Sequence, residues 1–168
     1  MSGPLSDPEF VAGLRPISTG LEGQPVPWPA VDLEGVTPGG APIRVALDET
    51  SGPVLLAFLA TRCDGCETFW NGLRASGPLA EFRSIEVVVV TKAPPSADAG
   101  EVERLAARLG SVPIVMSDTA WAEYRVSGYP FFVLVDPAAR KVVGETVAFG
   151  MDDVLALVTG GGAGDRRP

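Results

Sequence analysis

Apolar residues fall in three nearly continuous runs of strand length, over residues 54–60, 85–90 and 131–135. Runs of this kind are typical of strands that are buried on both faces of a largely parallel sheet. The second run consists mostly of valine, a β-branched residue that favours strands. A shorter apolar stretch at 112–116 predicts one further strand, so the pattern indicates a central sheet.

Other segments repeat apolar residues at the three- and four-residue spacing of an amphipathic helix. The segment that follows the first long run places on one face Cys66, Phe69, Trp70 and Leu73. Residues 101–109 predict a second helix that Gly110 closes, and residues 151–158 predict a closing helix. Asp118 is expected to cap a short helix over residues 119–124.

Two antiparallel hairpins are predicted near opposite ends of the chain. Residues 31–47 have apolar positions on both sides of a Pro-Gly-Gly turn, and residues 131–148 have an Asp-Pro turn between two apolar strands. The prolines just before the first hairpin keep that segment extended, because each proline disfavours a helical conformation in the residue before it. Trp28 in that segment is expected to pack over one end of the core.

A single domain over residues 25–158 contains every one of these elements. A chain of 168 residues is long enough for a core that needs no disulfide staples. Residues 1–24 are rich in glycine, serine and proline, and residues 159–168 are rich in glycine. We therefore expect a flexible segment at each end of the domain.

The charge balance excludes several classes of partner. The net charge is −8, and the Lys and Arg residues are scattered along the chain. We therefore expect no nucleic-acid partner and no polybasic patch for a membrane surface. No apolar stretch is long enough to span a bilayer, and no basic and apolar leader stands at the start, so a soluble domain is expected. A membrane tether or leader removed upstream is left open.

The cysteines and the missing histidine narrow the chemistry. The chain has two cysteines and no histidine, which excludes Cys–His nucleophiles, Ser–His–Asp triads and almost every zinc site. Cys63 and Cys66 are three residues apart, so a bond between them closes too short a loop to act as a structural staple. They stand where a buried strand runs into a helix, and there the helix dipole favours the reactive thiolate. No metal and no cofactor besides this redox-active pair are expected.

A second motif, Gly-Tyr-Pro at residues 128–130, leads into the third apolar run. With this motif, the order of elements from Pro25 to Val158 resembles that of thioredoxin-like thiol–disulfide oxidoreductases. The chain is similar to the bacterial branch related to cytochrome-c-maturation, alkyl-hydroperoxide-reductase and methylamine-utilisation thioredoxins, which has an N-terminal hairpin and an insert, here residues 92–124. The resemblance implies an α/β thioredoxin fold: a central mixed sheet flanked by helices, with an N-terminal β-hairpin extension.

The resemblance also implies a role for each site residue. The Cys63 thiolate attacks a disulfide of a protein partner, and Cys66 resolves the mixed disulfide, which leaves the two cysteines oxidised. Pro130 corresponds to the cis-proline that faces the thiols in the family. The backbone of Tyr129 is expected to pair with an extended segment of the substrate.

Charged neighbours are expected to tune the nucleophile. Arg62 and the helix dipole lower the pKa of Cys63, whereas Asp64 and Glu67 raise it. Arg62 is also a candidate contact for the partner. With two carboxylates so close, we expect a pKa in the upper part of the range of roughly 3.5–7.5 found at related sites, and a reducing couple.

Several positions depart from the thioredoxin pattern. Arg62 stands where thioredoxin has tryptophan, and Asp64-Gly65 stand where it has Gly-Pro. Ala57 replaces a buried acid that assists proton transfer to and from the resolving thiol in thioredoxin. These differences favour a narrower range of partners than that of a general thioredoxin.

The expected function is that of a thiol–disulfide oxidoreductase, a reductase or isomerase, which acts on protein disulfides as a monomer. One alternative is a peroxiredoxin-like peroxide reductase, although those enzymes have threonine three residues before the reactive cysteine and Thr61 is two before Cys63. The other is a non-catalytic redox-sensing or binding module. The expected location is extracytoplasmic, on the periplasmic or cell-envelope side, if a leader or anchor was removed, and cytoplasmic otherwise.

Overall fold

The computed structural model describes residues 27–74 and 76–160 of the chain. Two flexible segments are predicted, at 1–24 and at 159–168. The first lies outside the described ranges, and so does the second except for residues 159 and 160. The described strands are β1 (Trp28–Pro29), β2 (Leu33–Val36), β3 (Pro42–Val45), β4 (Val54–Phe58), β5 (Glu86–Thr91), β6 (Ile114–Met116), β7 (Phe131–Asp136) and β8 (Lys141–Val147). The described helices are the 3₁₀ helix η2 (Leu47–Glu49) and the α-helices α2 (Asp64–Gly72), α3 (Ala99–Ala106), α4 (Asp118–Glu123) and α5 (Met151–Val158).

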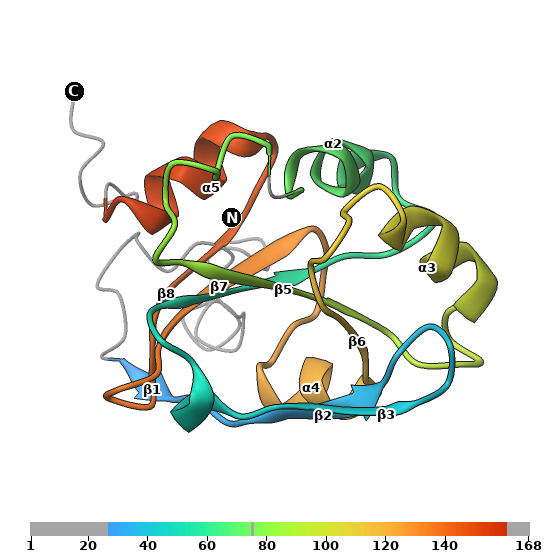
Figure 1. Ribbon diagram of the computed structural model, residues 1–168, viewed down its shortest axis with the longest axis horizontal. Coiled ribbons are helices and arrows are strands. Elements are labelled where there is room, and N and C mark those ends of the chain that lie inside the picture. Colours follow the sequence, from blue (N-terminus) through green and yellow to red (C-terminus); the bar gives the residue numbers. More distant parts are fainter. Residues whose placement is uncertain (1–26, 75, 161–168) are drawn as a thin grey trace, which may run out of the picture.

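The described strands form one mixed sheet in the order β1-β8-β7-β4-β5-β6-β2-β3. At its centre, β4 runs parallel to β5 and antiparallel to β7, so that Phe58 is level with both Val90 and Phe131. Because β6 is parallel to β5, the carboxyl ends of β4, β5 and β6 share one edge of the sheet. Figure 1 shows α2 and α5 on one side of the central strands β4, β5 and β7, and α4 on the other side, where the edge strands β2 and β3 also lie. The predicted α/β architecture is confirmed.

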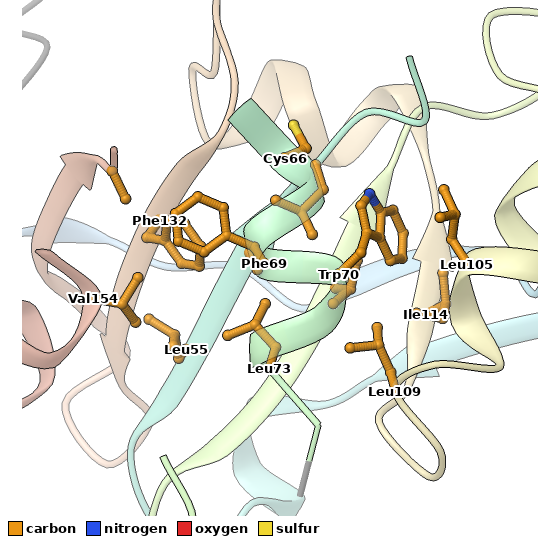
Figure 2. Packing of buried hydrophobic residues seen from close by; sticks show 14 of the residues in the cluster. Leu55, Cys66, Phe69, Trp70, Leu73, Leu105, Leu109, Ile114, Phe132 and Val154 are labelled. Atoms are coloured by element: carbon orange, nitrogen blue, oxygen red, sulfur yellow. The ribbon is translucent and has the colours of Figure 1, made fainter. Parts of the chain in front are cut away.

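Each face of the sheet carries its own apolar core, because side chains alternate between the two faces along a strand. All residues of β4 are buried. Leu55 belongs to the core under α2, α3 and α5, whereas Leu56 belongs to the core on the side of α4. In the first core, shown in Figure 2, Phe69 of α2 meets Phe132 of β7 with ring centroids 4.9 Å apart. Burial from both sides explains why the sequence of β4 is apolar without interruption.

The predicted N-terminal hairpin is present as β2 and β3, which pair antiparallel with Leu33 opposite Val45. It joins the rest of the sheet through the pair of Val36 with Met116 of β6. The neighbouring Gly35 is in close contact with the Met116 carbonyl, so that a side chain there would collide with the backbone of β6. The hairpin is shorter than predicted, because the chain turns into η2 at Leu47.

Trp28 has the packing role that the sequence predicts for it. Its ring is partly buried and lies 5.8 Å from the ring of Tyr124, centroid to centroid. The Arg125 guanidinium lies 5.0 Å from the same indole, which is cation–π distance. Tyr124 also hydrogen-bonds through its hydroxyl to the backbone of Val31, which fixes this end of the core.

The predicted cap of α4 is wrong by one residue. Ser117, which has an extended backbone with φ −158° and ψ 110°, is the N-cap, and its Oγ accepts a hydrogen bond from the Ala120 N–H at 3.0 Å. Asp118 is already helical, and its Oδ1 accepts from the Ala93 N–H instead, at 2.9 Å. The side chain of Asp118 therefore holds the loop after β5, and it does not cap its own helix.

Helix α3 is shifted toward the N-terminus relative to the predicted range 101–109. It begins at Ala99 because the Asp98 side chain accepts a hydrogen bond from the Glu101 N–H at 3.1 Å. Turns follow over residues 107–111, and within them Gly110 has a φ of +70°, which suits glycine. Among the described residues, no helix has the length and apolar character needed to cross a membrane.

Candidate active site

The two cysteines lie at the carboxyl end of β4, where the chain enters α2. Cys63 is the N-cap of α2, with φ −147° and ψ 114°, and Cys66 is in the first turn. The structure contains them as a disulfide, with the two Cα atoms 5.2 Å apart. Cys63 is half-buried, whereas Cys66 is fully buried. Of the two sulfur-bearing residues, only the first is open to an approaching partner.

Helix α2 holds the loop that carries the thiols. The Ala60 N–H donates to Cys66 Sγ at 3.5 Å, and the Ala60 carbonyl accepts from Trp70 Nε1 at 3.1 Å. Both side chains lie in the core shown in Figure 2. The helical spacing in the sequence predicts Trp70 only as an apolar residue of the helix, but its indole N–H also joins the residue after β4 to α2.

Pro130 lies against the dithiol loop, as the resemblance predicts. The peptide bond between Tyr129 and Pro130 is cis. A methyl group on the Cα of Gly65, between the two cysteines, would be 3.6 Å from Pro130 Cδ, which is ordinary van der Waals contact. The two segments meet because β7 begins at Phe131, directly opposite Phe58 at the end of β4.

The two charged residues that flank the cysteine motif are both engaged in ion pairs. Arg62 Nη2 lies 2.9 Å from Glu101 Oε1 of α3, and Glu67 Oε1 lies 2.7 Å from Arg108 Nη1. The hydrogen bond to the Glu101 carboxylate, together with its charge, raises the pKa of Arg62 above its usual range. Asp64 is exposed and forms no ion pair with any residue that the structure describes. Of these three side chains, Asp64 keeps its charge least compensated.

Ala57 is fully buried in the same core as Cys66. It is the position at which thioredoxin has a buried acid, and here only a methyl group is present.

In the described residues, no group of three or more His, Cys, Asp or Glu side chains is arranged to hold a metal ion.

Near Tyr129 and Pro130 lie three further residues for which the sequence predicts no role in the site. They are Lys92, Trp121 and Phe149. Tyr129 is 50% exposed, and the centroid of its ring is 5.9 Å from that of Trp121. Lys92 Nζ lies over the Trp121 ring, 5.0 Å from the ring centroid. Phe149 is 89% exposed and follows Ala148, whose N–H donates to the Pro130 carbonyl at 3.4 Å. No local sequence signal marks the contact of Lys92 and Tyr129 with Trp121, because it forms only where the end of β5, the start of β7 and helix α4 come together.

The strand order, with a Cys-x-x-Cys pair at the start of a helix and a cis-proline against it, defines a thioredoxin-fold protein. Solved structures support this at the level of the fold. A thioredoxin-like protein from Aeropyrum pernix superposes with a TM-score of 0.62 at 17% identity, over 77% of this chain and 89% of that one. A secreted Mycobacterium tuberculosis disulfide oxidoreductase homologous to Escherichia coli DsbE gives 0.59 at 20% identity, over 76% and 95%.

A third structure, a putative thiol:disulfide interchange protein DsbE from Chlorobium tepidum, gives a TM-score of 0.60 at 22% identity, over 78% of this chain and 91% of that one. No protein-family model matches the chain, and no curated protein matches it by sequence. These similarities establish the thioredoxin-like fold.

Proposed function

We propose that this protein is a thiol–disulfide oxidoreductase, a reductase or isomerase, that acts on protein disulfides through Cys63 and Cys66. The observation that carries the proposal is the contrast between the two residues: Cys63 is only partly buried at a helix N-terminus, and Cys66 is fully buried behind it. This is the arrangement that an attacking thiol and a resolving thiol require. The disulfide oxidoreductases among the similar structures support the same class.

In the reductive direction, the reduced protein acts in two exchange steps. The Cys63 thiolate attacks one sulfur of the partner's disulfide, and the other partner sulfur leaves as a thiolate that takes a proton from water. Cys66 then loses its proton and attacks Cys63 Sγ, which releases the partner's second sulfur. Two electrons have passed to the partner, and the Cys63–Cys66 disulfide must be reduced again by an external dithiol.

Strand β4 contains no acidic or basic side chain that could accept the proton of Cys66. The thiol lies in an apolar core, and Ala57 occupies the position from which thioredoxin presents a carboxylate. Burial disfavours the thiolate that the second step needs. We therefore propose that resolution is slower than in thioredoxin and that the mixed disulfide is long-lived, which suits a narrow set of partners.

The proposed location is extracytoplasmic, and the proposed working form is a monomer. One of the similar structures is described as a secreted protein, which supports export. In such compartments protein disulfides are stable and need dedicated dithiol proteins for reduction or rearrangement.

Reduction of insulin disulfides in the presence of dithiothreitol tests the proposed activity. The wild-type protein should accelerate insulin precipitation, and Cys63→Ser should not. Because the chain has only two cysteines, Cys66→Ser leaves a single thiol, which should accumulate a mixed disulfide that mass spectrometry detects. Equal rates for the wild-type protein and Cys63→Ser would refute the proposal, and rapid peroxide consumption in a stopped-flow assay would favour a peroxide reductase.

A further inference from the structure

A lysine, a tryptophan and a tyrosine form a cluster beside the dithiol that the proposed exchange steps do not use. Lys92 is the first residue after β5, whose carboxyl end shares a sheet edge with that of β4. Its Nζ lies 5.0 Å from the centre of the Trp121 ring, and this ring also meets Tyr129 edge-on at 5.9 Å. One indole therefore separates the ammonium group from the residue that precedes Pro130.

The charge of Lys92 is not neutralised by another described residue. At the same rim, Arg62 and Arg108 each pair with a glutamate, but Lys92 is in no ion pair within the described part of the chain. The nearby Asp118 carboxylate accepts a hydrogen bond from the Ala93 N–H. Lys92 thus forms no direct ion pair with Asp118 or with any other described residue, on a protein whose net charge is −8.

The position of Lys92 is also restrained. The side chain is half-buried, and its stacking on Trp121 is a cation–π contact with a ring that is only 3% exposed. Trp121 is fixed in turn by an edge contact with Phe58 of β4, with centroids 5.5 Å apart. A cation that is already held in place loses little side-chain entropy when a ligand binds.

We infer that Lys92, held on Trp121 beside Tyr129, is a subsite for an acidic side chain of the protein segment whose disulfide is exchanged. The inference rests on the proposed function, in which an extended segment passes over Tyr129 and Pro130. Successive side chains on one face of an extended segment are roughly 6.5 Å apart. A carboxylate two residues from the partner's cysteine reaches toward Lys92, while the exposed Tyr129 ring lies against the backbone of the residue between them, whose side chain points away.

Reduction of matched peptides tests this subsite. The peptides contain one intramolecular disulfide and differ only in Glu, Gln or Lys two residues from a cysteine, with both flanks sampled. The reduced wild-type protein should act on the best Glu peptide with a kcat/KM about two- to fivefold above that for its Gln counterpart, as expected for a partly exposed ion pair. The gain should lie in KM and should shrink in high salt.

Lys92→Met should abolish the preference for Glu and leave reduction of the Gln peptide within about twofold, because methionine keeps an apolar stem on the indole. The matched control is Lys141→Met. Lys141 is the only other lysine in the sequence, and it lies opposite Asp136, at the end of β7 farthest from Pro130. This control should keep the preference, and unchanged thermal unfolding midpoints should show that both variants fold.

Two results would overturn the inference while the proposed function stands: equal reduction of the Glu and Gln peptides by the wild-type protein, or a Glu preference that survives in Lys92→Met. A preference for the Lys peptide would also overturn it, and would point to Asp64 as the charge that the partner meets. If the wild-type protein reduces neither these peptides nor insulin, the proposed function itself fails, and the inference fails with it.

Discussion

Pro130 and Gly65 are in contact across the candidate active site, although 65 positions separate them in the sequence. The proline ring lies at van der Waals distance from the position that a Cβ on Gly65 would occupy. The contact places the start of β7 against the residue between the two cysteines. A partner disulfide that reaches Cys63 must therefore approach beside Pro130.

Gly65→Ala should stabilise the oxidised protein by about 0.5–1 kcal/mol. Gly65 lies within α2, where alanine has the higher helix propensity, and the new methyl group fits against Pro130 at 3.6 Å. Urea unfolding of the oxidised protein measures the change. Gly72→Ala, in the last turn of the same helix, should gain less, because its Cβ would lie 2.9 Å from Met151 Sδ and force that side chain to move. Equal gains at both positions would contradict this account of the contact.

Asp64→Asn should make Cys63 more reactive at neutral pH. The Asp64 carboxylate is exposed, unpaired among the described residues and next to Cys63 in sequence, so that it opposes formation of the thiolate. In a Cys66→Ser background, the alkylation rate of Cys63 should rise about twofold, and its pH profile should move to lower pH. Glu67→Gln is the matched control. Its effect should be smaller, because Arg108 already compensates the Glu67 charge.

Trp70→Phe should destabilise the protein by about 1–2 kcal/mol, as measured by chemical unfolding. The change removes the donor to the Ala60 carbonyl, at the start of the loop that carries the thiols, and leaves a smaller ring in the core. Trp121→Phe is a comparison at a second buried indole, whose Nε1 has no hydrogen-bond partner among the described residues. If both substitutions cost the same, the hydrogen bond to Ala60 contributes nothing measurable.

Asp32→Asn should lower the free energy of unfolding at pH 7 by about 1 kcal/mol. Asp32 accepts a hydrogen bond from the Leu47 N–H at 2.9 Å. This bond is the main reason that the pKa of the Asp32 carboxyl is below its usual value, and the ion pairs with Arg44 and Arg140 lower the pKa further. A lowered folded-state pKa gives stability that is present above the unfolded-state pKa and is lost as the pH falls through the folded-state pKa.

The difference between the wild-type protein and Asp32→Asn should therefore shrink as the pH falls below the ordinary pKa of an aspartate, and it should disappear only below the lowered pKa of the folded protein. Urea unfolding at pH 7 and at pH 3 tests this dependence. Asp48→Asn, at an exposed position of η2, is the control for the substitution itself. A deficit for Asp32→Asn that is equal at both pH values would mean that the loss comes from packing and not from ionisation.

Much of the fold follows from local patterns in the sequence. The apolar run that becomes β4 predicts a strand buried on both faces, and the spacing of Cys66, Phe69 and Trp70 predicts the face of α2 that meets the core. The resemblance of the motifs predicted the cis bond before Pro130. The buried strand and the helix face are set by a few consecutive residues, because strand and helix periodicities are properties of short segments.

By itself, the sequence determined the strand that ends at the thiols, the helix that starts with them and the candidate pair Cys63 and Cys66. Only the tertiary structure decided which charges act near that pair. It paired Arg62 with Glu101, 39 residues away, and it laid Lys92 on Trp121 beside Tyr129. The physical reason is that a side chain's partner depends on how distant elements pack and turn toward one another, and this orientation is a property of the whole core that no short segment encodes.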